Sequence, residues 1–352
     1  MSPLGPIGPI SQDWAFMEDT KIRTAVVGAG KMGSIHAKVY SQLPDSQLVA
    51  VVDADKARAA QLAEKYGCVA YTDCKEILDK VDAVTIATPT TTHLELAKLF
   101  LYNRIPVLVE KPLASSVREG RKIVSLARRY DTVVAVGHSE RCNPVAQAVK
   151  RLDIEPKFIE AQRVSPYPFR STDVGVVLDI MIHDIDIILS LARSKIKRVD
   201  AVGVTVIQGG EDICNARIVF DNGCIANITA SRLALKTERR VRVFSREAYV
   251  NVDYLKKSGI VIKTDPNKNV VDMIKEWRGR NDFNPVAVNW PDLLHIEQLE
   301  IDDKEPIRLE QEAFLRAVKD RSCEPEVSAE EGLAALRCAQ KILRAVKKHK
   351  WD

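Results

Sequence analysis

A run of glycines lies between an apolar strand and a helix near the start of the chain. Residues 22–27 (IRTAVV) are apolar and β-branched, which is typical of a buried strand. Gly28, Gly30 and Gly33 follow at once in the spacing G-x-G-x-x-G, and an apolar helical pattern then continues through Leu43. This order of strand, glycine turn and helix predicts a parallel α/β sheet whose first helix begins at the glycines.

The same glycines have the features of a dinucleotide site. Gly28 permits the tight turn, Gly30 lets the backbone approach a pyrophosphate, and Gly33 allows close packing of the helix on the strand. Lys31 and Met32 begin the helix, where free N–H groups and the positive end of the helix dipole favour phosphate. We therefore expect these five residues to bind a dinucleotide cofactor.

Asp53 indicates which dinucleotide is bound. It ends the second predicted strand, 20 residues after Gly33, where a carboxylate accepts hydrogen bonds from the adenosine ribose. A carboxylate there also repels a 2′-phosphate, so NAD is favoured over NADP. Lys56 and Arg58 lie close by in sequence and keep NADP open as the weaker alternative.

Strand and helix patterns alternate through the first 137 residues, as in a doubly wound parallel sheet. Ligands bind such sheets at the carboxyl ends of the strands. Three segments fall there: residues 88–93, Glu110-Lys111-Pro112 and residues 137–141. From the first two we assign further cofactor-binding residues, namely Thr88, Pro89, His93, Glu110 and Lys111.

Lys111 is the strongest catalytic candidate in this half of the chain. It follows a buried strand end and stands between Glu110 and the rigid Pro112, which places its ammonium beside the nicotinamide. There it can donate a hydrogen bond to a substrate hydroxyl, and burial can lower its pKa. A solvated loop lysine is the alternative.

A second group of polar residues lies on an apolar helical pattern at residues 173–192. Asp179, His183 and Asp186 have the spacing i, i+4 and i+7, which puts them on one face of an α-helix. His183 with Asp179 one turn away is a general base with an orienting partner. A metal triad and a polar patch between helices are the alternatives; we predict no metal.

The ordered series GAGKMG, Asp53, ATPTTTH, EKP and GHSERCNP resembles the Gfo/Idh/MocA family of NAD(P)-dependent sugar and polyol dehydrogenases. The likeness runs from about Lys21 to the last helix. It implies a Rossmann domain followed by an α/β domain built on an open, mostly antiparallel sheet. It also implies that Lys111 is catalytic and that the D-x-x-x-H pair Asp179 and His183 faces it. The family pattern has two glycines before this helix, where this chain has Val174 and Gly175.

The remaining patterns divide the chain. Runs between residues 199 and 253 are rich in β-branched residues, and Asp221-Asn222-Gly223 is typical of a hairpin turn. The polar stretch 256–294 predicts long connections, and helices are expected over 309–319 and 328–348. We expect a flexible arm (1–20), an NAD-binding Rossmann domain (21–142), a substrate and oligomerisation domain (143–305) and helices that pack back on the Rossmann domain (306–352). The resemblance implies a homodimer or homotetramer formed through the open sheet.

The substrate is indicated by a loop stiffened by proline, RVSPYPFR, which contains Arg163, Tyr167 and Arg170. Arginines suit phosphates and aromatic rings stack on a base or sugar, so the loop favours a nucleotide sugar; a solvated rim loop is the alternative. Together with Arg141 and Asn143 of GHSERCNP, it most resembles the UDP-N-acetylglucosamine 3-dehydrogenase subgroup. That resemblance implies NAD-dependent oxidation at C3 of the sugar, as in the 2,3-diamino sugar of lipid A. A dehydrogenase of a free sugar or polyol and a non-catalytic nucleotide sensor stay open.

Composition narrows the class of protein. The 352 residues are 46% hydrophobic and 28% charged, as in an ordinary globular protein, and the net charge of +4 gives little reason to expect nucleic acid. No apolar run approaches the roughly 18 residues of a membrane span, and the first 20 residues lack the pattern of a signal peptide. The seven cysteines are scattered without a C-x-x-C, which favours reduced thiols and a cytoplasmic location.

Overall fold

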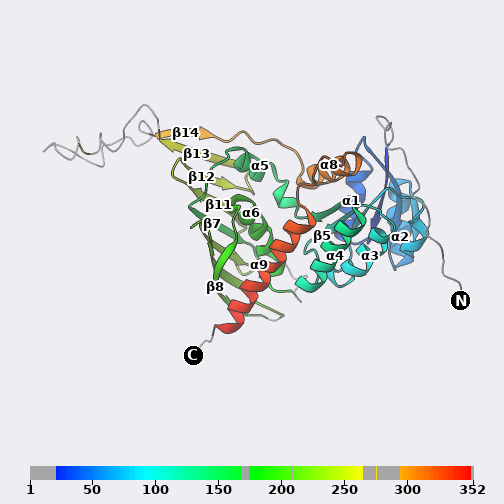
Figure 1. Ribbon diagram of the computed structural model, residues 1–352, viewed down its shortest axis with the longest axis horizontal. Coiled ribbons are helices and arrows are strands. Elements are labelled where there is room, and N and C mark those ends of the chain that lie inside the picture. The colour runs from blue at the N-terminus through cyan, green and yellow to red at the C-terminus, as the bar shows by residue number, and fades with distance from the viewer. Residues whose placement is uncertain (1–20, 168–173, 208, 265–274, 276–293, 350–352) are drawn as a thin grey trace.

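Two sheets with helices between them form the protein (Figure 1). The computed structural model describes residues 21–167, 174–207, 209–264, 275 and 294–349. The predicted arm (1–20) and Arg170 lie outside the described residues.

The first sheet has six strands in the order β3-β2-β1-β4-β5-β6, and every pair of neighbours is parallel. The doubly wound sheet predicted from the sequence is confirmed. Its strands are β1 (Ile22–Val27), β2 (Ser46–Val52), β3 (Val69–Tyr71), β4 (Ala83–Ile86), β5 (Val107–Glu110) and β6 (Val134–Gly137). Its helices are α1 (Lys31–Tyr40), α2 (Lys56–Tyr66), α3 (His93–Tyr102) and α4 (Val117–Tyr130), with short 3₁₀ turns η1 (Cys74–Ile77), η2 (Thr90–Thr92) and η3 (Ser139–Arg141).

The second sheet has eight strands in the order β14-β13-β12-β11-β7-β10-β9-β8. Only β7 and β10 are parallel neighbours, so the predicted mostly antiparallel sheet is confirmed. Its strands are β7 (Phe158–Val164), β8 (Ile196–Val204), β9 (Ile213–Phe220), β10 (Ile225–Ser231), β11 (Glu238–Phe244), β12 (Ala248–Asp253), β13 (Ser258–Thr264) and β14 (Leu294–Gln298). The predicted hairpin turn joins β9 to β10, with Gly223 at φ +84°.

The prediction of long connections over residues 256–294 is wrong at its start. Strand β13 lies inside that stretch and pairs with both β12 and β14. Residues Ile260, Val261 and Ile262 carry the β-branched signal, but polar neighbours on both sides concealed it. Most of the remaining stretch lies outside the described residues.

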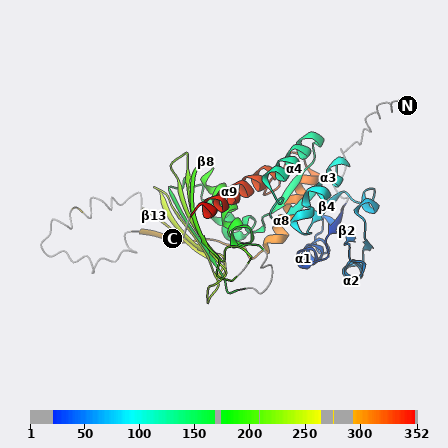
Figure 2. The ribbon, with the colours of Figure 1, turned by 90° about the horizontal axis from the view of Figure 1, so that it is seen from below.

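Helices fill the space between the two sheets (Figure 2). Helix α8 (Pro306–Lys319) packs on the first domain, where Phe314 joins the core around α1 and β2. Helix α9 (Ala329–Lys348) bridges both halves, because Leu333 and Leu336 join one core while Cys338 and Ile342 join the other. Helices α5 (Pro144–Arg151) and α6 (Ile182–Ala192) cover the inner face of the second sheet.

Two further features complete the fold. Within the described ranges, no helix has both the length and the apolar character needed to cross a membrane. All seven cysteines are free, and five of them are buried.

Candidate active site

The glycine turn has room only for glycine at two of its positions. Gly28 has φ +101°, and a Cβ there would lie 2.5 Å from the carbonyl oxygen of Ala87. A Cβ on Gly33 would lie 1.7 Å from the carbonyl oxygen of Gly28, which forces the close packing of α1 on β1. Gly30 faces open space and is the N-cap of α1, with no side chain hydrogen-bonded to the first-turn N–H groups. The turn therefore fits a pyrophosphate.

Asp53 follows β2 and faces this turn. Its carboxylate accepts hydrogen bonds from the backbone N–H groups of Ala29 (2.7 Å) and Asp55 (2.8 Å) and from Arg58 (3.0 Å). Burial opposes ionisation of the group, but these three donors outweigh burial and lower the pKa of Asp53. The acid is thus ionised and held beside the turn, as a ribose-binding carboxylate must be.

His93 joins two of the loops that leave the strand ends. It is fully buried, with Nε2 3.0 Å from the carbonyl oxygen of Thr88 and Nδ1 3.1 Å from that of Pro112. Burial lowers the pKa of His93 despite both carbonyls, so the ring is neutral and donates to one of them at a time. The predicted cofactor residues Thr88 and His93 therefore lie together, and His93 fixes the loop that leads into Lys111.

Glu110 belongs to a buried polar chain that the sequence analysis did not find. Its Oε1 lies 2.8 Å from Nε2 of His36, and Gln311 of α8 lies 2.9 Å from the other ring nitrogen. The Oε2 atom accepts from the backbone N–H of Lys111 (3.1 Å). Burial raises the pKa of Glu110, but the His36 contact and Lys111 outweigh it and lower the pKa overall. Glu110 thus holds the backbone at Lys111.

Lys111 and Asp179 meet across the two domains, as predicted. The Lys111 Nζ donates to the backbone carbonyl of Asp179 (2.8 Å) and lies 3.3 Å from its Oδ1. The two side chains remain 20% and 35% exposed, so a substrate can reach both. The ammonium is therefore fixed by the backbone carbonyl and the carboxylate of Asp179 together, while both side chains stay partly exposed.

The start of the helix that carries Asp179 is wider than an α-helix. Residues Val177–Met181 (η4) form a π-turn, and α6 follows from Ile182. The sequence spacing assumed α-helical geometry throughout; no hydrogen bond joins Asp179 to His183 in the described part of the chain, and the predicted orienting role of Asp179 stays a prediction. Among the described residues, the Asp179 carboxylate pairs with Lys111 instead. Such π-turns occur frequently at functional sites.

His183 lies close to three cationic side chains. Burial is the main cause that holds the pKa of His183 well below its usual value, and Lys111, Arg163 and Arg239 act in the same direction. Its Nδ1 is buried and has no hydrogen-bond partner in the described part of the chain. A neutral imidazole results, which can accept a proton at neutral pH.

Arg163 faces the protein interior rather than a substrate. Its guanidinium donates to Asp184 of α6 (2.8 Å and 3.1 Å) and to Glu140 (3.0 Å), and the residue is only 5% exposed. This geometry does not favour the predicted contact with a phosphate. Arg239, which the sequence analysis missed, also donates to Glu140 (3.1 Å) but remains 44% exposed.

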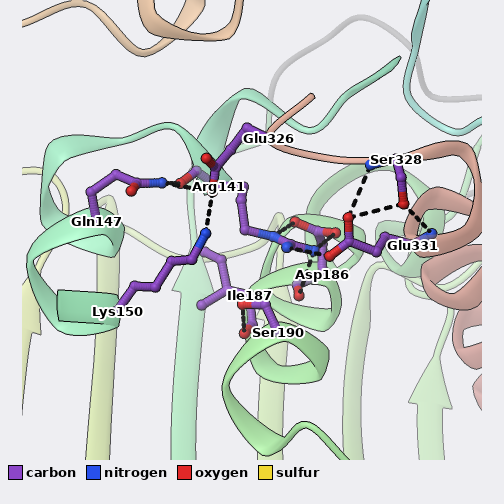
Figure 3. A network of polar contacts seen from close by, with 9 residues as sticks. All are labelled: Arg141, Gln147, Lys150, Asp186, Ile187, Ser190, Glu326, Ser328 and Glu331. Atoms are coloured by element: carbon purple, nitrogen blue, oxygen red, sulfur yellow. Dashed lines mark hydrogen bonds and ion pairs between the residues drawn. The ribbon is translucent and has the colours of Figure 1, made fainter. Parts of the chain in front are cut away.

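Arg141 is likewise committed to carboxylates of the protein, of which Asp186 is buried (Figure 3). It donates to Asp186 through two nitrogens (2.8 Å and 2.7 Å) and to Glu331 of α9 (2.8 Å). Asn143 is buried and caps α5 by accepting from the N–H of Val145 (3.0 Å). Arg141 therefore ties the Rossmann domain to α6 and α9, and its predicted contact with substrate stays a prediction, as does that of Asn143.

Tyr167 is the last described residue before the gap at 168–173, and the guanidinium of Arg232 lies 5.5 Å from its ring centroid.

Glu211 caps the π-turn: its Oε1 accepts from the N–H of Val177 (3.0 Å). A Cβ on Gly175 would lie 2.3 Å from that same atom, so a larger residue at this position would displace the Glu211 carboxylate. Nothing in the local sequence predicts this contact, because 34 residues separate Glu211 from Val177.

No group of three or more His, Cys, Asp or Glu side chains suited to a metal ion occurs among the residues that the structure describes. Asp179, His183 and Asp186, the alternative triad, have separate surroundings: Lys111 for Asp179, a cationic environment for His183 and Arg141 for Asp186.

An ammonium and a neutral imidazole beside a dinucleotide-binding turn define an oxidoreductase that uses a nicotinamide cofactor. The comparisons with known proteins make the class narrower. Residues 22–138 match the Gfo/Idh/MocA oxidoreductase family, described as an NAD-binding Rossmann fold, and residues 156–251 match the C-terminal domain of the same family. The chain belongs to the Gfo/Idh/MocA family and is an NAD(P)-dependent oxidoreductase.

Individual relatives differ in what they act on. The UDP-N-acetylglucosamine 3-dehydrogenase of Acidithiobacillus ferrooxidans is 36% identical over 66% of this chain and 74% of its own length. A solved structure of an enzyme of that name from the same organism has a TM-score of 0.83, with 29% identity over 93% of this chain and 98% of that one. The scyllo-inositol 2-dehydrogenase (NAD(+)) of Bacillus subtilis is 29% identical over 74% of this chain and 82% of its own.

Proposed function

We propose that this protein oxidises a secondary hydroxyl of a nucleotide sugar with NAD, and that the substrate is UDP-N-acetylglucosamine, oxidised at C3. The observation that carries the proposal is the contact of Lys111 with Asp179, both partly exposed, with His183 close enough for the ammonium to lower its pKa. The 36% identity to a UDP-N-acetylglucosamine 3-dehydrogenase supports the choice of sugar.

The cofactor would be held by the glycine turn, by the start of α1 and by Asp53, which suits an unphosphorylated ribose and hence NAD. When bound, the nicotinamide accepts the hydride that leaves the sugar carbon. The loops fixed by His93 and Glu110 bring Lys111 to the same side of the sheet.

The chain itself supplies the proton chemistry. His183 is neutral because of burial and nearby cations, so it accepts the hydroxyl proton. Its Nδ1 points into the protein interior, which leaves Nε2 for the substrate. Lys111 donates a hydrogen bond to the same oxygen and stabilises its negative charge as the proton departs. Asp179 holds the ammonium of Lys111 in place through its carbonyl and carboxylate.

We assign the diphosphate to Arg239 rather than Arg163. Both arginines lie on the inner face of the sheet and are direct neighbours on β11 and β7. Arg163 is enclosed by Asp184 and Glu140, whereas Arg239 is 44% exposed and makes one contact, with Glu140. An arginine that is partly exposed and already close enough to lower the pKa of His183 suits an anionic substrate group.

Arg239→Ala tests this assignment. Loss of a charge-assisted contact worth about 1.4 kcal/mol raises KM for UDP-N-acetylglucosamine about tenfold, while kcat changes little. Arg240→Ala is the matched control, because Arg240 is the next residue of the strand and faces the opposite side of the sheet, in a cavity of about 290 Å³ with Asn251 and Asp253. Equal KM values for the two variants would remove Arg239 from the substrate site.

The proposed activity is tested directly by mixing the purified protein with NAD and UDP-N-acetylglucosamine and recording the absorbance of the reduced nicotinamide. Because the equilibrium favours the alcohol, a ketone trap is included. We expect reduced cofactor with the UDP-sugar and none with free N-acetylglucosamine. Reduction with inositol instead would favour a free-polyol dehydrogenase, which the likeness to the inositol enzyme supports. Binding of NAD and UDP-sugar without turnover would favour a sensor.

We also propose that a second copy of the chain covers the outer face of the eight-stranded sheet. Figure 2 shows helices on the inner face of this sheet and none of the described helices on the outer one. Val202, Val204 and Phe244 are exposed there although they are large and apolar. Light scattering should give at least twice the mass of one chain, and Val204→Lys should lower it; a monomer at all concentrations contradicts the proposal.

A further inference from the structure

His138 is a buried histidine whose ring lies next to that of His183. His138 follows β6 and is fully buried, yet neither of its ring nitrogens has a hydrogen-bond partner in the parts of the chain that the structure describes. The Nδ1 of His183 lacks a partner in the same way. Leaving a buried polar group unpaired is unfavourable, so three such nitrogens at one place require an explanation.

The two rings lie next to each other. Their centroids are 6.4 Å apart and their planes are at 89°, an edge-to-face arrangement. No hydrogen bond joins the two rings in the described part of the chain, and a bridging solvent molecule would pair a nitrogen of each ring. Both residues stand at the boundary of the two domains, since His138 ends the Rossmann sheet and His183 lies on α6.

The charges around His183 make a protonated ring unfavourable. Burial is the largest cause of its lowered pKa, followed by Lys111, Arg163, the neighbouring ring of His138 and Arg239. Each turnover nevertheless delivers the hydroxyl proton to this ring. A proton that stayed there would be buried beside three cations, so it must leave for the reaction to proceed forward.

The surroundings of His138 differ from those of His183. Burial also lowers the pKa of His138, but the carboxylates of Asp186 and Glu110 raise it, against the cations of Arg141 and Lys111. Negative charge on two sides therefore favours a proton at His138 relative to His183. The charges around the two rings therefore favour movement of a proton from His183 to His138, away from the substrate.

We propose that His138 is a positioning residue that acts through His183. It is the second acceptor of the substrate proton, which reaches it from His183 through one bridging solvent molecule. The proposal rests on the function proposed above. The substrate O–H bond breaks and an N–H bond forms at Nε2 of His183. The Nδ1 proton of His183 passes to the bridging molecule, which gives a proton to His138. The carbon-bound hydrogen leaves as hydride, and NAD is the oxidant.

The first test uses two variants of His138. His138→Phe keeps a ring but cannot carry a proton, and His138→Gln keeps hydrogen-bonding groups but cannot carry one either. We expect both to lower kcat for UDP-N-acetylglucosamine about tenfold, with KM and NAD affinity near those of the wild type. Recovery of kcat in the Gln variant would mean a structural role and would overturn the proposal.

Isotope effects separate the proton step from the hydride step. In the wild type, we expect substrate deuterated at the oxidised carbon to slow turnover, because the hydride step is limiting. In both variants the effect of deuterated solvent on kcat should rise and that of deuterated substrate should fall, because departure of the proton has become limiting. Unchanged isotope effects, or a larger effect of deuterated substrate, would contradict a relay.

A measurement without turnover covers the case in which the proposed substrate is not used. Nitrogen-15 NMR of the histidine rings in the cofactor-free protein reports the hydrogen bonding of Nδ1 in His183. We expect this resonance to move in His138→Phe and to stay in place in His295→Phe, a change at an exposed histidine far along the sheet. A resonance that does not move in His138→Phe refutes the coupling. Absence of reduced cofactor in the wild type with a moved resonance refutes only the substrate.

Discussion

The two halves of the active site are built in different ways. The dinucleotide half uses backbone: glycines that leave no room for a Cβ, free N–H groups at the start of α1, and one carboxylate at a strand end. The hydroxyl half uses side chains from distant segments, with Lys111 of one domain fixed by Asp179 of the other. The first half depends on local spacing, and the second on which buried charges meet.

The two halves differ in how well they tolerate substitution of a side chain. A backbone site is maintained as long as the strand, turn and helix fold together, and no side chain needs a particular charge except Asp53. The hydroxyl half depends on buried ion pairs, Arg141 with Asp186 and Arg163 with Asp184, which hold α6 in place. Removing one member of such a pair leaves a buried charge without a partner, and that is strongly destabilising.

The largest effect is expected at the hydroxyl half. Lys111→Ala and His183→Ala should each lower kcat by about 10² or more, because a proton acceptor or its electrostatic partner is lost. The Kd for NAD, measured by fluorescence, should stay near that of the wild type. Lys98→Ala, an exposed lysine paired with Glu95, is the matched control and should change neither.

Lys111→Ala makes a second expected change, in the pH profile. The ammonium of Lys111 is one of the causes that lower the pKa of His183, after burial. Without it the pKa of His183 rises, so the acidic limb of the residual kcat/KM moves to higher pH. A loss of activity with an unmoved limb would mean that the two groups do not share one site.

The contrast between the halves also explains what the sequence could predict. The parallel first sheet, the glycine turn and the place of Asp53 at a strand end follow from patterns within about 30 residues, where the physical requirement and the residue spacing coincide. Lys111 and Asp179 were predicted to face each other, and the structure brings them together, but that expectation came from the resemblance to a family.

The contacts of Asp179, His183 and Arg163 could not be predicted from the sequence, because they depend on residues distant along the chain. The spacing of Asp179 and His183 suits an α-helix, and the π-turn that changes it is set by Glu211, which approaches from another loop. Arg163 looked free to bind phosphate, because its partners Asp184 and Glu140 are separated from it by 21 and 23 residues. Sequence indicates that a charge is present but not whether a buried partner already neutralises it.

A smaller effect is expected at the dinucleotide half. Asp53→Ala removes the acceptor of the ribose hydroxyls and should weaken NAD about tenfold, since a hydrogen bond to a charged group contributes about 1.5–3 kcal/mol. The substitution should also reduce the difference in Kd between NAD and NADP, while kcat at saturating NAD stays nearly unchanged. Asp53→Asn should have an intermediate Kd. Tighter binding of NADP than NAD by the wild type would show the assignment of cofactor to be wrong.

Substitution of Glu211 tests whether the π-turn supports catalysis at the hydroxyl half of the site. Glu211→Ala leaves the N–H of Val177 without its acceptor, a loss of about 1 kcal/mol, and lets Asp179 shift. We expect kcat to fall about fivefold without a change in the Kd for NAD, and Glu211→Gln to restore most of it. Glu64→Ala, on the exposed side of α2, is the control. An effect on NAD binding instead would place Glu211 outside this half of the site.

The smallest expected effect is on stability in mild acid, and it too distinguishes the halves. Burial lowers the pKa of His138 and His183. Below about pH 6.5 the unfolded chain takes up protons at these residues while the folded chain does not, so the free energy of unfolding decreases as pH falls. Each histidine contributes at most about 1.4 kcal/mol per pH unit over that window.

Asp53 does not contribute to this change, because its pKa is lowered and the carboxylate stays ionised in mild acid. Denaturation in urea at pH values from 8 to 5 should therefore give decreasing stability, while the Kd for NAD stays constant over the same range. His138→Gln should flatten the stability curve, whereas His295→Gln, at an exposed histidine, should leave it unchanged. A Kd for NAD that rises in parallel with the loss of stability would mean that the two halves are one cooperative unit, and the distinction between backbone and side-chain construction would then carry no functional consequence.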